Sequence, residues 1–336
     1  MTSQAFHLPA AEAGSPPPFD PELAAALTVI NQSFPPDAYR AEIIAEVRAR
    51  EVPGAEQLTN EALSRDGAFR VEERNVPGPD GAPDIPLLIC RPTGAVTPTG
   101  AIYWVHGGGM ILGDNRTGIL AMLDFAQELQ LAVVSVGYRL APETPYPGPV
   151  EDCYAGLVWT SEHAEELNVD PERIIIAGGS AGGGLAAGAA LMARDRGGPR
   201  LFGQFLRCPM LDDRNDSPSA HQMAGVGVWD RSSNETGWTA VLGEKRGGDD
   251  VSPYAAPARA AELFGLPPTF IDVGSAETFR DEDVAYASAI WRAGGIAELH
   301  VWPGGFHGFD QLAPDAALSK SARAAQADWF RRLLQA

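Results

Sequence analysis

The feature that most constrains the fold of this chain is a repeated alternation of apolar, strand-like segments and helical segments from residue 69 onward. Six segments have the composition of buried strands, at 101–105, 131–138, 173–177, 202–210, 269–273 and 297–302. Helices are expected at 117–129, 149–167, 181–194, 280–293 and 318–334. Two earlier strands, 69–75 and 85–91, should form an antiparallel hairpin. Because strands that alternate with helices form parallel sheets covered on both faces, we predict an α/β fold with a mostly parallel sheet of about eight strands.

Two stretches interrupt this alternation and predict a helical cap. Residues 1–60 contain a proline-rich start and two expected helices, one capped by Asp20 and one beginning at Pro36. Residues 211–253 are rich in aromatic side chains but lack the two-residue period of a strand. The expected division is a cap of 1–60 and 211–253 and an α/β domain, which would carry the chemistry, of 61–210 and 254–336.

The charge balance and the cysteines exclude several classes of protein. The chain has 44 acidic and 25 basic residues and a net charge of −19. Such a surface repels phosphate backbones and anionic lipid heads, which argues against nucleic-acid and membrane partners. Because the chain shows neither an apolar run of about 18 residues nor a basic leader before an apolar segment, we expect a cytoplasmic protein. Cys90, Cys153 and Cys208 are odd in number and lie outside any Cys/His motif, so we expect free thiols and no metal site.

A G-x-S-x-G pentapeptide, Gly178–Gly182, lies between the expected strand 173–177 and a helix of small residues. A serine at such a turn takes a strained backbone conformation that raises its hydroxyl above the sheet edge, and side chains at the flanking positions would clash. The pattern predicts Ser180 as a nucleophile. The N–H of Ala181, at the start of the helix, could stabilise an oxyanion. The alternative is a tight turn whose glycines serve helix packing alone.

A second glycine-rich loop, His106–Gly109, follows the expected strand 101–105. Consecutive glycines allow backbone N–H groups to point into a cleft, and acyl transfer needs such donors for the oxyanion of its tetrahedral intermediate. A phosphate-binding loop is the alternative. It is disfavoured because no Lys-Ser/Thr pair follows and no G-x-G-x-x-G motif with a later acidic residue is present.

A general base and an orienting acid should come from later loops at the same edge of the sheet. His307 follows the last expected strand, and a histidine in that loop can reach Ser180; the alternative is a loop histidine that makes a turn hydrogen bond. Four carboxylates are candidates for the acid: Asp272, Glu277, Asp281 and Asp283. Glu277 is favoured because it lies in the loop itself, whereas the others lie in a strand or in the first turn of a helix.

Four motifs together resemble the hormone-sensitive-lipase-like (family IV) esterases of the α/β-hydrolase fold: His106–Gly109, Tyr138–Glu143, Gly178–Gly183 and His307–Phe309. The resemblance places the oxyanion hole at Gly108 and Gly109 and leaves Gly107 open. It also aligns the family's D-P-L-R-D-E stretch with 277–282, which implies Glu277 as the catalytic acid. This chain departs from the family by having Glu for Asp and Thr278 for Pro, so Asp281 and Asp272 stay open as alternatives.

The resemblance implies a carboxylesterase that forms an acyl-enzyme on a Ser–His–Glu triad and needs no cofactor or metal. Short-to-medium acyl esters are the expected small-molecule substrates, and a homodimer through the last strand and helix is implied by the resemblance alone. Apolar cap residues should wall the pocket, unless they only pack the cap: Phe34, Met223, Val228, Trp229 and Trp238. The alternatives are an amidase, a lactone or drug-ester hydrolase on the same triad, and a ligand receptor without catalysis.

Overall fold

A single eight-stranded sheet runs through the molecule, with the strand order β1-β2-β4-β3-β5-β6-β7-β8. The computed structural model describes residues 13–33, 35, 39–49, 58–79 and 81–335. Its strands are β1 (Phe69–Val76), β2 (Ile85–Pro92), β3 (Thr99–Val105), β4 (Ala132–Val136), β5 (Val169–Gly179), β6 (Gly203–Arg207), β7 (Thr269–Gly274) and β8 (Ala297–Trp302). The β1–β2 and β2–β4 pairs are antiparallel and the other pairs are parallel. The predicted α/β fold with its mostly parallel sheet is confirmed.

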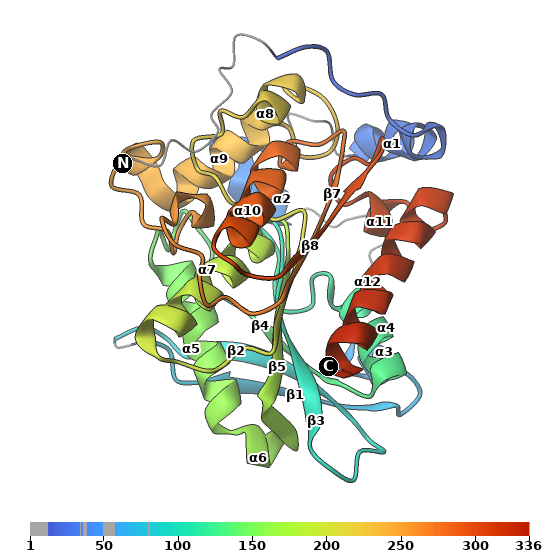
Figure 1. Cartoon of the computed structure of the whole chain (residues 1–336), viewed down its shortest axis with the longest axis vertical. Helices are drawn as coiled ribbons and strands as arrows, with labels where there is room; N and C mark the ends of the chain where they lie inside the picture. Colours follow the sequence, from blue (N-terminus) through green and yellow to red (C-terminus); the bar gives the residue numbers. More distant parts are fainter. Residues whose placement is uncertain (1–12, 34, 36–38, 50–57, 80, 336) are drawn as a thin grey trace.

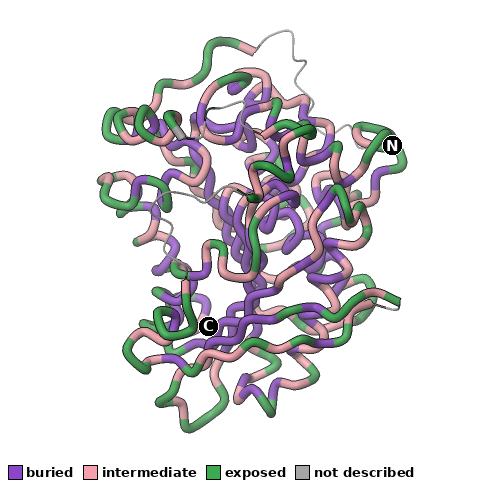
Figure 2. The backbone as a smooth tube through the Cα atoms, turned by 180° about the vertical axis from the view of Figure 1, so that it is seen from behind, coloured by how far each residue is buried: buried purple, intermediate pink, exposed green. Residues whose placement is uncertain are grey.

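Helices cover both faces of the sheet (Figure 1). They are α3 (Asn60–Ser64), α4 (Ile119–Leu129), α5 (Gly148–Glu162), α6 (Ala164–Leu167), α7 (Ala181–Arg196), α10 (Arg280–Arg292), α11 (Phe309–Leu312) and α12 (Ala317–Gln335). Strand β3 shows why both faces are covered. Tyr103 and Val105 belong to the core cluster with α5 and α7, whereas Ile102 and Trp104 belong to the cluster with α4 and α12. In Figure 2, buried segments run through the middle of the molecule and exposed segments form its edges.

The structure corrects several predicted boundaries. The helix expected at 149–167 is interrupted at His163, where backbone angles outside the helical region separate α5 from α6. The strand expected at 202–210 ends at Arg207, because Cys208 has a positive φ of 35° that an extended strand does not allow. The short helices α3 and α11 were not predicted, since each is too short to show a clear apolar period.

The segments expected to form a cap contain further helices: α1 (Pro21–Ser33), the 3₁₀ turn η2 (Ala41–Ile43), α2 (Ile44–Ala49), α8 (Pro218–Gln222), α9 (Arg231–Leu242) and the 3₁₀ turn η3 (Gly243–Lys245). Helix α1 begins as predicted, with the Asp20 carboxylate accepting the N–H groups of Glu22 and Leu23 at 2.9 and 3.2 Å. The second predicted helix starts later, at Ala41, and Pro36 lies outside the described residues. Helices α1, α8 and α9 all lie toward the top of Figure 1.

No helix in the described ranges combines the length and the apolar composition needed to cross a membrane.

Candidate active site

Ser180 lies at a sharp turn between β5 and α7. Its backbone angles are φ 56° and ψ −125°, a region that side chains other than glycine rarely adopt. Hydrogen bonds on both sides hold the turn in place: the Ser180 N–H donates to Arg207 O at 2.8 Å, and Ser180 O accepts the N–H groups of Gly184 and Met210 at 3.1 and 2.9 Å. The strained turn predicted from the pentapeptide is therefore present.

The two flanking glycines leave room for this turn. A Cβ atom on Gly178 would lie 2.2 Å from Gly182 O, and a Cβ atom on Gly182 would lie 2.1 Å from Val105 O. Both distances are far below a van der Waals contact and both involve backbone atoms, so neither position accepts a side chain without moving the strands.

His307 bridges Ser180 and Glu277. In the neutral tautomer with its proton on Nδ1, His307 accepts the Ser180 hydroxyl at Nε2, at 2.9 Å, and donates Nδ1–H to Glu277 Oε1 at 3.3 Å. Glu277 is only 2 % exposed. The Phe279 N–H donates to the same oxygen at 3.3 Å, and the Phe279 ring meets the imidazole edge-on, with 5.1 Å between the ring centres. The structure thus brings together the serine, histidine and glutamate that the sequence analysis favoured.

Asp281, one of the two rival acids, faces a different partner. Its carboxylate accepts the Ser219 N–H at 2.8 Å and pairs with Arg280 Nε at 2.7 Å. The Ser219 contact holds the start of α10 against α8, and among the described residues the hydrogen-bond partner of His307 Nδ1 is Glu277 and not Asp281.

Asp272, the other rival, is inside β7 and belongs to a buried polar cluster. Trp302 Nε1 and Gln326 Nε2 donate to its carboxylate at 3.2 and 2.9 Å. Burial, together with the neighbouring Asp310 carboxylate, raises the pKa of Asp272 to about 7. Its hydrogen bonds therefore run toward β8 and α12, away from the imidazole of His307.

Three backbone N–H groups lie around the nucleophile turn, at Gly108, Gly109 and Ala181. Gly108 and Gly109 have φ values of 114° and 62°. Gly108 O accepts the N–H groups of Ile111 and Leu112 at 3.0 and 2.9 Å, which closes the loop into a turn. The N–H groups of Gly108, Gly109 and Ala181 find no acceptor in the part of the chain that the structure describes. They are available to a substrate oxygen. Gly107 instead packs its Cα against the turn, where an added Cβ would lie 2.9 Å from Gly179 O.

His106 supports this loop from below. It is fully buried, stacks on the Tyr138 ring with 4.1 Å between centres, and its Nδ1 lies 2.8 Å from Gly107 O. The Tyr138 hydroxyl donates to His106 O at 2.9 Å. Burial lowers the pKa of His106 to about 4, so that the ring is neutral at pH 7. His106 and Tyr138, the first residues of the motifs His106–Gly109 and Tyr138–Glu143, therefore hold each other in place.

The rest of the tyrosine motif makes structural contacts. The Arg139 guanidinium makes a two-point contact with the buried Asp152 carboxylate on α5, both N–O distances being 2.7 Å. Glu143 pairs with Arg48 of α2 at 2.8 Å. Both contacts fix the loop after β4 to neighbouring helices.

Trp229, one of the five expected pocket residues, is in contact with the oxyanion loop. A Cβ atom on Gly109 would lie 2.3 Å from Cη2 of the Trp229 indole, so the indole leaves no room for a side chain at that position. Met223 and Trp238 are buried, and Val228 packs on the α1–α11 cluster. Phe34 lies outside the described residues.

The sequence analysis assigned no role at the site to two residues that lie near it, Thr278 and Cys208. Thr278, which replaces the proline of the family motif, donates its hydroxyl to Trp229 O at 2.6 Å, and its own carbonyl accepts the Ser219 hydroxyl at 2.8 Å. Cys208 Sγ lies within 4.8 Å of ligand atoms of His307 and Glu277. Its position directly after β6, at the same sheet edge, was the available signal.

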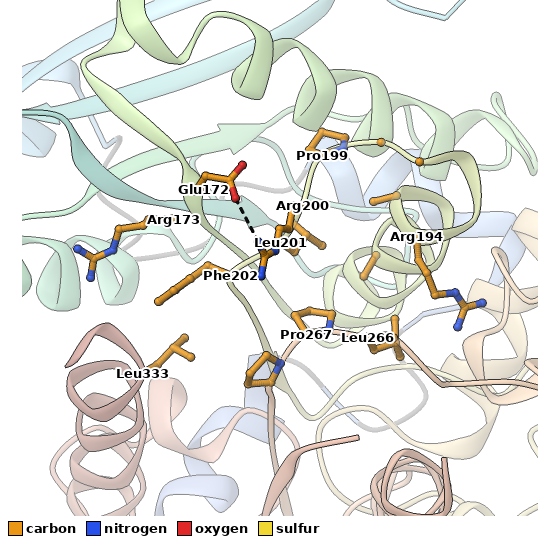
Figure 3. Close-up of a pocket in the computed structure, with 16 residues that line it drawn as sticks. Glu172, Arg173, Arg194, Pro199, Arg200, Leu201, Phe202, Leu266, Pro267 and Leu333 are labelled. Atoms are coloured by element: carbon orange, nitrogen blue, oxygen red, sulfur yellow. Dashed lines mark hydrogen bonds and ion pairs between the residues drawn. The ribbon is translucent and has the colours of Figure 1, made fainter. Parts of the chain in front are cut away.

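A groove of about 770 Å³ lies at the opposite end of the sheet (Figure 3). Its lining includes Arg173 of β5 and Phe202 and Pro268, which directly precede β6 and β7. Glu172 and Arg200 form an ion pair of 3.5 Å across it. The amino ends of parallel strands lie away from Ser180, so this groove takes no part in the site.

Several known proteins are similar to this chain in sequence or in structure. A family model described as alpha/beta hydrolase fold matches residues 102–311. The chain is 35 % identical to carboxylesterase NlhH of Mycobacterium tuberculosis over 301 residues, which cover 87 % of this chain and 90 % of that protein. The solved structure of a bacterial heroin esterase is similar, with a TM-score of 0.81 and 39 % identity over 95 % of this chain and 98 % of that one. Esterase LipW from Mycobacterium marinum has a TM-score of 0.82 and 33 % identity over the same shares.

Proposed function

This chain belongs to the alpha/beta hydrolase fold family and is a carboxylic ester hydrolase, and we propose that it cleaves short-to-medium acyl esters with Ser180, His307 and Glu277. The expected enzyme class and the resemblance to hormone-sensitive-lipase-like esterases are confirmed. The observation that carries the proposed triad is the chain of contacts from Ser180 Oγ through the imidazole to Glu277 Oε1, at 2.9 and 3.3 Å.

In the first step Ser180 Oγ attacks the ester carbonyl and its proton passes to His307 Nε2. Glu277 holds the proton on Nδ1, which leaves Nε2 free to act as the base, and its charge stabilises the imidazolium that forms. Because Glu277 is almost fully buried, water screens this interaction little.

The oxyanion of the tetrahedral intermediate would accept the N–H groups of Gly108, Gly109 and Ala181. These donors are fixed before the substrate binds, so they stabilise the developing charge without reorganisation. The alcohol leaves with the proton from His307. Water then attacks the acyl-enzyme with His307 again as the base and releases the acid.

The proposed preference for short-to-medium acyl chains rests on the expected position of the cap. We propose that 1–60 and 211–253 cover the catalytic domain, 61–210 and 254–336, and that Trp229 limits the space beside Gly109. A series of p-nitrophenyl esters should give the highest kcat/KM at short-to-medium acyl chains, because a longer chain meets the indole. A maximum at long chains would contradict the proposed pocket, and faster cleavage of matched amides or lactones would favour those substrates.

The nucleophile is tested by Ser180→Ala, which should lower kcat by about four orders of magnitude or more with the fold unchanged. A fluorophosphonate probe should label Ser180 in the wild-type protein, as located by peptide mass spectrometry. The matched control is Ser321→Ala on the exposed surface of α12, which should keep both activity and labelling. Wild-type turnover in Ser180→Ala would overturn the assignment.

We also propose that the protein forms a homodimer and that it lies in the cytoplasm. Strand β8 is at the edge of the sheet, and Trp291, Ile296 and Val301 near it are 47, 68 and 41 % exposed. An unpaired edge with apolar side chains favours contact with a second copy. Light scattering after gel filtration should give a dimer mass, and a monomer mass at micromolar concentration would contradict this part.

A further inference from the structure

Two residues of the proposed triad and a neighbouring cysteine together form a group of potential metal ligands. Cys208 Sγ, a ring nitrogen of His307 and a carboxylate oxygen of Glu277 all lie within 4.8 Å of one another. The three residues follow β6, β8 and β7, which are neighbours in the sheet. The sequence showed no Cys/His motif because only the folded sheet edge brings these residues together.

Cys208 is held in an unusual conformation. Its φ of 35° is positive, which is unfavourable for a residue other than glycine and persists only where the surroundings fix it. The Cys208 N–H donates to Asp272 O at 2.7 Å, which continues the β6–β7 pairing by one residue. The thiol therefore has a fixed place next to the triad.

Glu277 has an oxygen with no partner. Oε1 accepts from His307 and from the Phe279 N–H, whereas Oε2 is buried and accepts no hydrogen bond in the described chain. A buried acceptor without a partner is destabilising, and more so for a charged group. A cation beside Oε2 would remove this cost.

The surroundings of the thiol are acidic. The Asp272 and Asp310 residues border the same small cavity as Cys208 and Glu277, and the one cation among the lining residues, Arg207, is paired with Asp310 at 3.4 Å. Carboxylates around a thiol favour a divalent cation, which displaces the thiol proton on binding. A cavity of about 10 Å³, close to the size that holds one water molecule or ion, borders Cys208 and Glu277.

We propose that Cys208, Glu277 and His307 form an inhibitory binding site for Zn²⁺, with the fourth position open to water. Thiolate, imidazole and carboxylate are ligands that zinc accepts together in a tetrahedral site. On binding, the Cys208 S–H and His307 Nδ1–H bonds break, and sulfur–zinc and Nδ1–zinc bonds form. The thiol proton leaves to solvent and the imidazole proton moves to Nε2, with no change of oxidation state.

Zinc binding at this site would stop hydrolysis. A zinc ion that coordinates Glu277 and His307 withdraws both from their mutual hydrogen bond, and the imidazole no longer takes the Ser180 proton. This consequence rests on the proposed triad, whereas zinc binding itself does not. Mg²⁺ and Ca²⁺ prefer all-oxygen sites and should not bind.

The first experiment compares inhibition in EDTA-treated wild-type protein, Cys208→Ala and Cys208→Ser, each relative to its own rate without zinc. The matched control is Cys153→Ala, which removes another buried free thiol on α5. The zinc concentration for half inhibition should rise at least tenfold in both Cys208 variants and stay unchanged in the control. Equal sensitivity of wild-type and Cys208 variants, or equal inhibition by Mg²⁺, would overturn the proposal.

The second experiment measures binding without catalysis, in Ser180→Ala. Competition with a chromophoric chelator should give one Zn²⁺ per chain, and Co²⁺ should give a thiolate-to-metal charge-transfer band; both should be lost in Ser180→Ala/Cys208→Ala. Absence of the band and of zinc binding in Ser180→Ala would overturn the metal site even if the triad is correct. Zinc binding that leaves wild-type hydrolysis unchanged would overturn the inhibitory role. If Ser180→Ala is inactive at the same time, the proposed nucleophile is still correct, and only the inhibitory role has failed.

Discussion

The two loops on either side of Ser180 reach their positions by different means. The oxyanion loop, 106–113, is placed by backbone conformation: Gly108, Gly109 and Gly113 all have positive φ values. The acid loop, 274–282, contains one glycine, at its start. It is held by side chains from distant parts of the chain, such as the Ser219 hydroxyl, which donates to Thr278 O at 2.8 Å.

This difference determines how each loop should respond to substitution. A loop placed by its backbone fails when a side chain is added, because the space and the φ angle both exclude a Cβ atom. A loop placed by side chains fails when a hydrogen-bonding group is removed, because a buried partner is left unsatisfied. The following predictions add atoms to one loop and remove groups from the other.

The largest effect is expected in the acid loop itself. Glu277→Gln should lower kcat by about 10³–10⁴-fold with little change in KM, because the amide does not hold the required tautomer or stabilise the imidazolium. The matched variant is Asp281→Asn, whose carboxylate contacts Ser219 and Arg280 and should cost less than about tenfold. A collapse of kcat in Asp281→Asn with an active Glu277→Gln would show that the acid is wrongly assigned.

A smaller loss is expected when a methyl group is added to the oxyanion loop. Gly109→Ala should lower kcat by about 10²–10³-fold, the loss typical of one oxyanion donor, because its Cβ would meet the Trp229 indole at 2.3 Å. The control is Gly294→Ala, with a similar positive φ of 78° and open space around it. Similar losses of kcat in both variants would mean that backbone strain, not the oxyanion loop, is responsible.

The contact between the acid loop and the expected cap should have a moderate effect. Thr278→Val removes the donor to Trp229 O, at 2.6 Å, and should lower the free energy of unfolding by about 1–3 kcal/mol. The kcat should fall by less than about tenfold, because Glu277 moves only slightly. Thr28→Val on the exposed surface of α1 is the control. Urea unfolding that gives equal values for Thr278→Val and wild type would contradict the proposed role of this hydrogen bond.

The smallest effect concerns pH. Asp272, in the strand before the acid loop, and His106, in the oxyanion loop, should change stability with opposite signs. The pKa of Asp272 is raised to about 7, so its contribution to stability is lost as pH rises from about 4 to about 7. The pKa of His106 is lowered to about 4, so its contribution is lost as pH falls below about 6.5. Asp272→Asn should therefore make stability rise more steeply between pH 4 and 7. Parallel stability curves for variant and wild type, from urea unfolding, would contradict this sign.

The sequence predicted what depends on the local backbone. The strand–helix alternation predicted the sheet, and the glycines beside Ser180 and in the oxyanion loop marked positions where the structure has no room for a side chain. His307 was identified because a loop after the last strand must lie at the same sheet edge as Ser180.

Side-chain contacts between distant segments could not be predicted. Asp281 and Glu277 are four residues apart, and only the position of Ser219, far away in the chain, shows that Asp281 has a different partner. Trp229 and Trp238 are the same residue type and lie in the same segment, yet the three atoms nearest to an added Cβ on Gly109 all belong to Trp229. Cys208 also lies close to the triad because its own positive φ ends β6 at the preceding residue, Arg207.

The central claim is that Ser180, His307 and Glu277 act together beneath a fixed oxyanion hole. A crystal structure of the covalent phosphonate adduct tests it most directly. We predict phosphorus bonded to Ser180 Oγ, a phosphoryl oxygen that accepts the N–H groups of Gly108, Gly109 and Ala181, and an imidazole that still donates to Glu277. An adduct on another residue, a phosphoryl oxygen turned away from these N–H groups, or an imidazole paired with Asp281 or Asp272 would contradict the claim.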